Sequence, residues 1–133
     1  MEARIVKQLS IFIENRPGML AAVCRRVADA GINLKAISVS EAIDHAVVRM
    51  IMSDVSKARE VLATEGVIAL ENEVMEVALD DRPGALAALT EKLVSAGINL
   101  EYAYGSSPAD PAQGLIIIRA DKPDAALKTA LEL

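Results

Sequence analysis

The sequence predicts an α+β protein made of two tandem copies of one βαββαβ unit, and two observations support this. The first is an internal repeat: residues 14–34 and 80–100 are identical at 11 of 21 positions without a gap, at an offset of 66 residues. The second is that both copies show the same order of strand-like alternation and helix-like periodicity. Because the match includes the loops on both sides of a helix, a whole supersecondary unit has been duplicated.

The first copy opens with residues 8–14, where apolar and polar side chains alternate as in a half-buried strand. A helix is expected to begin at Pro17, because proline at the first helical position lacks only an N–H that would have no partner. Gly31 is expected to stop this helix. Its apolar face is formed by Leu20, Val23, Cys24 and Val27. The elements that follow are strands at residues 32–40 and 46–53, a helix at residues 57–65 and a strand from residue 67.

The second copy repeats this order, with strands at residues 75–79, 98–105 and 115–120 and helices at residues 83–96 and from about residue 123. It lacks or truncates its last strand, because the sequence stops at Leu133 just after the second helix. Residues 67–80 are either two short strands or one long strand shared between sheets. Helices that return over one face of an antiparallel sheet give a ferredoxin-like sandwich, so we expect two such modules, residues 1–70 and residues 71–133.

The small size of each unit predicts that the copies pack together, since about 66 residues bury too little surface to be stable alone. In the ferredoxin-like strand order the second strand of each copy is a sheet edge, and joining these two edges would cover both. Residues 115–118 are all apolar, as in a strand buried on both faces. Because helices cover one face only, we expect a second chain on the other face and hence a homodimer.

Composition excludes several classes of function. The net charge is −5 and the aromatic residues are two Tyr and one Phe, which argues against binding to nucleic acid. No run of about 18 apolar residues could span a membrane, and the N-terminus does not resemble a secretory signal. Cys24 is the one cysteine and His45, in a solvated turn, the one histidine. We therefore expect a cytoplasmic protein with no disulfide, metal, cofactor or Ser/His/Asp or Cys/His catalytic set.

The N-terminus of the first helix in each copy is the candidate ligand site, because its unpaired N–H groups and partial positive charge suit a carboxylate. The expected donors are the N–H groups of Gly18, Met19, Leu20, Gly84, Ala85 and Leu86. Gly18 and Gly84 also have no side chain to block a ligand. The alternative is that each Pro-Gly pair only starts a helix.

Other side chains have two interpretations each. Asn33 and Asn99 follow the first helix of each copy and either cap a turn or contact a ligand. Tyr102 and Tyr104 share one face of a strand, where interface packing is favoured over ligand stacking. Cys24 is interpreted as core filling rather than as a reactive thiol.

Two motifs at the same spacing in both copies resemble the ACT domain, a small ligand-binding module of amino-acid metabolism. The first copy reads NRPGML at residues 15–20 and GINL at residues 31–34, and the second reads DRPGAL at residues 81–86 and GINL at residues 97–100. The resemblance covers nearly the whole chain. Most family members are attached to enzymes that they regulate, so the resemblance implies a pair of such modules with no enzyme.

The resemblance also implies how a ligand is held. In the family, the asparagine at the position of Asn33 and Asn99 reaches across paired strand edges to a ligand at the Pro-Gly loop of the other module. Asn15 matches a ligand-contacting position of the serine-sensing branch, and the second copy has Asp81 there. Pairing of the edges would set Asn33 against the Asp81 loop, which carries an extra negative charge and would attract an α-ammonium group more strongly.

We expect a non-catalytic, allosteric regulatory protein that binds a free amino acid or a similar small carboxylate and acts on an enzyme or another protein partner. The serine-sensing branch has a histidine where this chain has Ile13 and Leu79, so serine itself is not implied. One alternative is a small ferredoxin-like enzyme acting on a compact anion, although each Pro-Gly loop offers only Arg16 or Arg82. The other alternative is a pure protein-interaction module.

Overall fold

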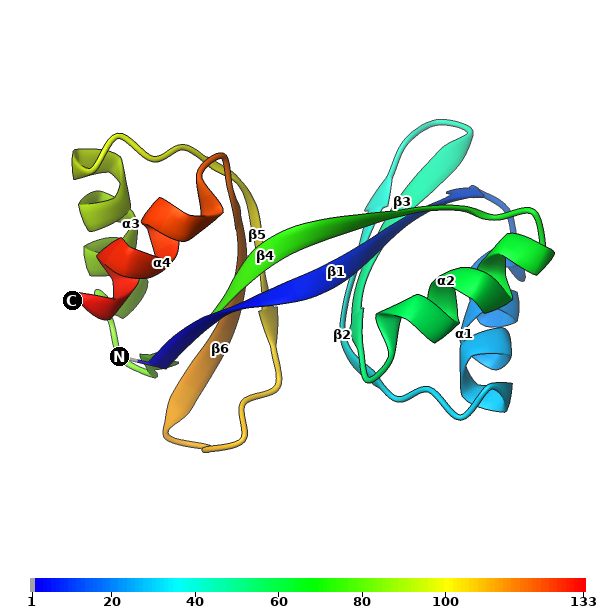
Figure 1. The fold of residues 1–133 in the computed structure, drawn as a ribbon, viewed down its shortest axis with the longest axis horizontal. Coiled ribbons are helices and arrows are strands. Elements are labelled where there is room, and N and C mark those ends of the chain that lie inside the picture. The colour runs from blue at the N-terminus through cyan, green and yellow to red at the C-terminus, as the bar shows by residue number, and fades with distance from the viewer. Residues whose placement is uncertain (1) are drawn as a thin grey trace. The chain divides into compact units, whose positions relative to one another are not determined.

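The computed structural model describes residues 2–133 (Figure 1). The element order in this range is βαββαβ for the first copy and βαββα for the second, with one long strand shared between them. The elements are β1 (Glu2–Glu14), α1 (Met19–Asp29), β2 (Leu34–Glu41), β3 (His45–Met52), α2 (Val55–Thr64), β4 (Ile68–Asp80), α3 (Ala85–Ser95), β5 (Leu100–Ser106), β6 (Gln113–Ala120) and α4 (Pro123–Leu131). Neighbouring strands are hydrogen-bonded in the order β2-β3-β1-β4-β6-β5. The predicted α+β class with two ferredoxin-like modules is confirmed.

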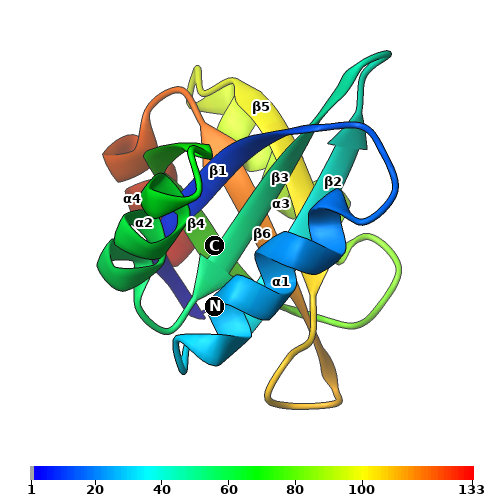
Figure 2. The same cartoon turned by 90° about the vertical axis from the view of Figure 1, so that its right-hand side faces the viewer.

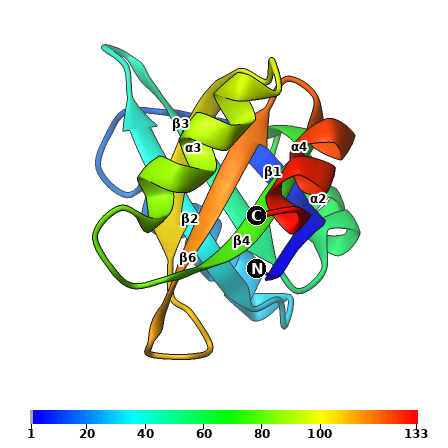
Figure 3. The same cartoon turned by 90° about the vertical axis from the view of Figure 1, so that its left-hand side faces the viewer.

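The chain divides into two compact units, each with a four-stranded sheet and two helices. The first unit is Lys7–Asn72, with the strand order β2-β3-β1-β4. The second unit is Glu73–Leu133 together with the segment Met1–Val6, and its strand order is β1-β4-β6-β5. Figure 2 shows α1 and α2 over the strands of the first unit, and Figure 3 shows α3 and α4 over those of the second. Both units therefore have their helices on one face of the sheet.

Strands β1 and β4 are each 13 residues long and contribute residues to both units. The open question about residues 67–80 is thus resolved in favour of one long strand. The sequence prediction placed the start of β1 too late, because Glu2 and the charged residues after it hide the alternation. In the second unit, the β1 half lies beside β4 at the position of a fourth strand, and Ala3 and Ile5 pack against the core there. The strand that the second copy lacks is therefore supplied by the beginning of the chain.

The helix boundaries differ from the prediction at the N-termini. Helix α1 begins at Met19 with Gly18 as its N-cap, so Pro17 is not the first helical residue. Helix α2 begins at Val55, earlier than expected, because the Asp54 carboxylate accepts a hydrogen bond from the Lys57 N–H at 3.0 Å. The predicted stop at Gly31 is confirmed, since Gly31 has φ of 75° directly after the helix.

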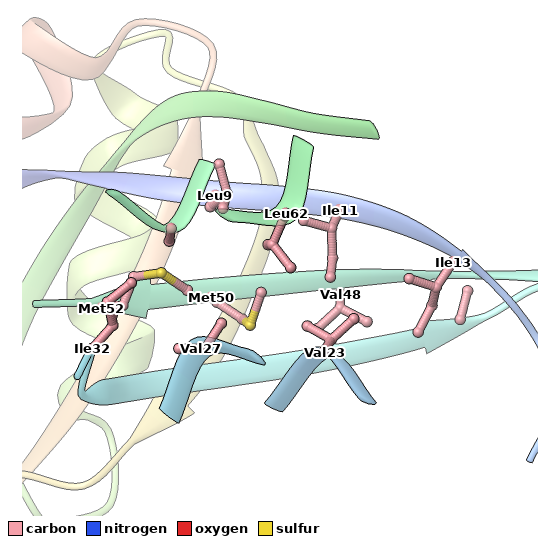
Figure 4. Packing of buried hydrophobic residues seen from close by; sticks show 12 residues of the cluster. Leu9, Ile11, Ile13, Val23, Val27, Ile32, Val48, Met50, Met52 and Leu62 are labelled. Carbon is pink, nitrogen blue, oxygen red and sulfur yellow. The ribbon is translucent and has the colours of Figure 1, made fainter. Parts of the chain in front are cut away.

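The core of the first unit lies between its sheet and its two helices (Figure 4). Val23 and Val27 from α1 and Leu62 from α2 pack against alternate residues of β1 and β3. The second unit has the equivalent core, in which Leu89, Leu93, Ala126 and Ala130 face Met75, Val77, Leu79, Ile118 and Ala120. Cys24 is half-buried on the apolar side of α1. The predicted apolar faces are therefore the ones that the helices bury.

Two residues of the apolar run in β6 are fully buried within a single chain, and the other two, Leu115 and Ile116, are half-buried. Ile118 is 0% exposed in the second core, and Ile117, on the opposite face of the strand, is only 1% exposed. A second chain is therefore not needed to cover this strand, and the argument for a homodimer from residues 115–118 is wrong. The predicted joining of the two edge strands within one chain is also wrong, because β2 and β5 stand at the two ends of the strand order.

Candidate ligand-binding site at the Pro-Gly turns

Each Pro-Gly pair forms the centre of a type II β-turn that ends a long strand and starts a helix. In the first unit the Met19 N–H donates to the Arg16 carbonyl at 3.4 Å, and Gly18 has φ of 87° and ψ of −13°. In the second unit the Ala85 N–H donates to the Arg82 carbonyl at 3.3 Å, and Gly84 has φ of 89° and ψ of −11°. Proline followed by a left-handed glycine is the sequence that this turn requires.

The two glycines are needed for backbone conformation rather than for space. A Cβ atom built on Gly18 or Gly84 meets nothing within 4 Å, so no contact inside the chain requires glycine at either position. A positive φ, however, strains any residue that carries a Cβ. The repeated glycine therefore fixes the direction in which the helix N-terminus points.

The turns leave N–H groups open at each helix N-terminus. The Met19 N–H is used in the turn, and the Ala22 N–H donates to the Gly18 carbonyl as the first helical bond. In residues 2–133 the structure records no backbone hydrogen bond from the N–H groups of Gly18 and Leu20. The N–H groups of Gly84 and Leu86, the equivalent residues of the second unit, likewise have no recorded backbone hydrogen bond in this range. Two of the three expected donors in each copy are thus available to an anion at the positive end of a helix.

Asn15 connects the first Pro-Gly turn to the hairpin between β2 and β3. Its backbone N–H donates to the Asp44 carbonyl at 3.1 Å. Its side-chain Nδ2 donates to Glu41 Oε1 at 3.1 Å and to the Ala42 carbonyl at 3.3 Å. The amide N–H groups of Asn15 therefore point into the protein, and Oδ1 is the atom of this side chain that could accept a hydrogen bond from a ligand.

Asp81 occupies the matching position in the second unit but is held through its backbone alone. Its N–H donates to the Ala112 carbonyl at 3.1 Å, which is the equivalent of the bond from Asn15. Over the described part of the chain its exposed carboxylate has no hydrogen bond or ion pair. The sequence analysis did not identify Glu41 as a residue of this site, although comparing the two copies could have done so. The first copy has an amide at position 15 and a carboxylate at Glu41, whereas the second has a carboxylate at Asp81 and a hydroxyl at Ser107. The residue before each Arg-Pro-Gly segment is thus either a carboxylate, Asp81, or an amide that is hydrogen-bonded to one, Asn15 with Glu41.

Asn33 and Asn99 are held in place by their backbones. The Asn33 N–H donates to Ser53 Oγ at 2.9 Å, and the Asn99 N–H donates to Asp121 Oδ1 at 3.0 Å. Both side chains are exposed, and neither makes a hydrogen bond to another residue in the range 2–133. The interpretation that these side chains cap a turn is therefore wrong for this structure.

Each asparagine is distant from the Pro-Gly turn of its own unit. Asn33 follows the C-terminus of α1, whereas Gly18 precedes its N-terminus, and 11 helical residues at 1.5 Å per residue separate them by about 16 Å. The same separation holds for Asn99 and Gly84 across α3. A single unit therefore does not bring the two predicted parts of the site together.

The remaining polar residues around the turns form local pairs. Arg16 Nε lies 2.7 Å from Glu14 Oε2, and Arg82 Nε lies 3.7 Å from Asp80 Oδ2, all exposed. His45 Nδ1 lies 3.0 Å from Asp44 Oδ1, and the hydrogen bond from His45 lowers the pKa of the Asp44 carboxyl below its usual value of 3.8. Surface pairs of this kind contribute little stability.

The described residues include neither a cluster that could hold a metal ion nor a helix that could span a membrane. Within residues 2–133 no three His, Cys, Asp or Glu side chains are placed so that they could hold a metal ion. Among the described helices, none has the length and apolar character required to cross a membrane. Tyr102 and Tyr104 do share one face of β5, as predicted, because they pair with Arg119 and Ile117 of β6.

Comparison with known proteins places the chain in a family. A family model described as an ACT domain pair matches residues 4–132. The crystal structure of protein BT0572 from Bacteroides thetaiotaomicron is 32% identical, with a TM-score of 0.90 over 98% of this chain and 89% of that chain. The ligand-free regulatory subunit of aspartate kinase from Thermus thermophilus has a TM-score of 0.68 at 19% identity, over 98% of this chain and 95% of that chain. This second likeness shows the fold alone.

No curated protein sequence matches the chain. The family model nevertheless covers both units and both Pro-Gly turns, and the resemblance inferred from the repeated motifs is confirmed. The chain therefore belongs to the ACT domain pair family.

Proposed function

We propose that this protein is a non-catalytic regulatory protein that binds a free amino acid or a similar small carboxylate. The observation that carries the proposal is the duplicated turn: two Pro-Gly turns of the same geometry each leave two N–H groups open at a helix N-terminus. A ligand carboxylate accepts these bonds from Gly18 and Leu20 or from Gly84 and Leu86. The N–H groups of Met19 and Ala85 do not bind the ligand directly but hold the two turns in shape by donating to the Arg16 and Arg82 carbonyls.

The ligand's α-ammonium group is bound by the side chains next to each turn. Asn15 Oδ1 and the nearby Glu41 carboxylate supply acceptors in the first unit, and the Asp81 carboxylate supplies them in the second. The side-chain amide of Asn33 or Asn99 completes the site from a second module. Because neither asparagine reaches the turn of its own unit, and β2 and β5 do not pair within the chain, we place the second module in another copy of the protein.

Regulation follows from a ligand held between two modules. Such a ligand stabilises the arrangement in which both parts of the site meet, and a partner that prefers this arrangement responds to ligand concentration. The fold shared with regulatory subunits of aspartate kinase, and the module's family, support an enzyme of amino-acid metabolism as that partner. One half-buried cysteine and no further thiol are compatible with a reducing cytoplasm.

The test is a thermal-shift panel of the twenty amino acids with the full chain. Saturation at about 100 times Kd adds about 2.7 kcal/mol, which raises the melting temperature by several degrees. The matched control is the carboxamide of the amino acid that gives the shift, which keeps the α-ammonium but removes the negative charge. We expect the carboxamide to give no shift. An equal shift from the carboxamide would contradict binding at the helix N-termini, and no shift from any amino acid would contradict the proposed ligand class.

A further inference from the structure

The first half of the long strand β4 has a side that no other strand covers. Strand β6 pairs with Met75–Asp80 of β4 and β1 lies along the other side, so within residues 2–133 the stretch 68–74 has no strand partner on the β6 side. At one end of this stretch the Glu73 carbonyl accepts a hydrogen bond from Arg119 Nη1 at 2.6 Å. Residues 68–72 therefore form an open edge of the first unit. Unpaired N–H and C=O groups on such an edge can pair with another chain.

The side chains along this edge are apolar and exposed. Ala69 packs against the first core, so Ile68 and Leu70, which alternate with it, lie on the sheet face away from the helices. Ile68 is 65% exposed and Leu70 is 51% exposed. Phe12 of the neighbouring strand β1 lies on the same face, is 38% exposed and pairs with half-buried Val47 of β3. An exposed apolar surface that begins at an open strand edge favours binding of another chain.

The equivalent edge in the second unit carries charged side chains instead. It is the beginning of β1, which lies beside β4 as the fourth strand of that unit. Ile68 is matched there by Glu2, at an offset of 66 residues. Leu70 is matched by Arg4, whose Nη2 lies 3.3 Å from Glu76 Oε1. Charged side chains protect an edge strand from pairing with other chains, so the repeat has one protected edge and one that is open to a partner.

The charge of the open edge indicates the kind of partner. Residues 65–73 contain three Glu and no Lys or Arg, so a second copy paired along this edge would bring no cation to it. Glu71 already lies 3.7 Å from Lys7 Nζ and 3.8 Å from Arg59 Nη1. The exposed carboxylate of Glu73, in contrast, makes no ion pair in the described part of the chain. The edge is therefore complementary to a different chain that is apolar and basic.

We infer that an extended segment of another protein adds to the sheet of the first unit along residues 68–72 of β4. The backbone of the segment pairs with the open N–H and C=O groups, and two alternate apolar side chains cover Ile68 and Leu70. A Lys or Arg opposite Glu71 reaches its diagonal neighbour Glu73. None of these groups belongs to the proposed amino-acid site, so the two proposals can fail independently.

The test uses the full chain and the synthetic peptide acetyl-TKVTIT-amide, which places Lys, Val and Ile opposite residues 71, 70 and 68 when it pairs antiparallel. The control peptide acetyl-TKTVIT-amide has the same composition, but its Val and Ile lie on opposite faces of a strand. We expect the first peptide alone to slow hydrogen exchange at amides of residues 68–72, and to leave residues 2–6 on the equivalent edge unchanged. Methylation of the peptide amides that face β4 should abolish binding.

Variants separate the apolar contacts from the charge. Ile68→Glu or Leu70→Glu is expected to raise the Kd of the peptide about tenfold or more. The matched control is Val94→Glu, since Val94 on α3 is 68% exposed and lies outside this surface, and it should leave the Kd unchanged. Glu73→Lys should weaken binding of the Lys peptide about two- to fivefold and strengthen binding of the same peptide with Glu in place of Lys.

Several outcomes would overturn the inference. One is that the peptide does not bind at millimolar concentration, and another is that Val94→Glu weakens binding as much as Leu70→Glu. Protection at residues 2–6 rather than at residues 68–72 would also contradict it. Self-association of wild type that Leu70→Glu abolishes would identify a second copy as the occupant in place of another protein. Failure of all amino-acid binding would overturn the proposed function and leave this surface standing.

Discussion

Replacing Gly18 or Gly84 by alanine isolates the contribution of the left-handed residue in the Pro-Gly turn. The two φ angles, 87° and 89°, strain a residue that carries a Cβ by about 1 to 2 kcal/mol. No packing clash adds to this, because the new Cβ meets no atom within 4 Å. Alanine also lowers the entropy of the unfolded chain, which returns about 0.4 to 1 kcal/mol. Taking the middle of each range, we expect a net loss of about 0.8 kcal/mol in the free energy of unfolding.

The measurement is urea denaturation followed by circular dichroism, with melting temperatures as a second readout. The matched control is Gly105→Ala, since Gly105 in β5 has no left-handed φ and its new Cβ also meets nothing within 4 Å. In this control only the entropy of the unfolded chain changes, so its free energy of unfolding is expected to equal or exceed that of wild type. Gly18→Asn should lose less than Gly18→Ala, because asparagine tolerates the left-handed region. If Gly18→Ala matches wild type, or Gly105→Ala loses as much, the reasoning about the turn is refuted.

Three further predictions follow from the same structure. Ile5→Ala should destabilise the second unit by about 1 to 2 kcal/mol, because half-buried Ile5 packs against the core of that unit. Hydrogen exchange should then rise more in β6, α3 and α4 than in β3, α1 and α2. An equal rise in both units would contradict this prediction. Because the pKa of the Asp44 carboxyl is lowered in the folded protein, its ionised form stabilises the fold above pH 3.8, and this contribution is lost as the pH falls through the lowered pKa. Asp44→Asn should therefore lower the melting temperature at neutral pH but not at the acid end of a pH series of melting curves. In calorimetry Asp81→Ala should weaken the tighter amino-acid binding event by about 1 to 3 kcal/mol, and Asn15→Ala should leave it in place. The reason is that the Asp81 carboxylate makes no hydrogen bond or ion pair in the described chain, whereas the Asn15 side chain is bonded to Glu41 and Ala42. The reverse outcome would show that Asp81 does not bind the ligand.

Much of the site could be predicted from sequence because it is made of local features. A type II turn needs only the adjacent Pro17 and Gly18, and a helix N-terminus exposes N–H groups wherever the helix lies. The repeat also allowed most residues of one copy to be compared with a counterpart in the other, apart from the two-residue insertion in the middle turn of the second copy. The predicted start of α1 at Pro17 was wrong, because a Pro-Gly pair can form either a β-turn before a helix or the first turn of the helix itself. The local sequence is compatible with both conformations.

Sequence alone was enough to predict the repeated unit, its core faces and the positions of Gly18, Gly84, Asn33 and Asn99, because periodicity and turn chemistry act over a few residues. Which strands are neighbours became known only from the three-dimensional structure. Hydrogen bonds between strands depend on the whole sheet, so no local pattern showed that β1 supplies the strand missing from the second unit. For the same reason only the fold showed that β2 and β5 are separate edges, so that Asn33 and the Asp81 loop are not joined by edge pairing within the chain.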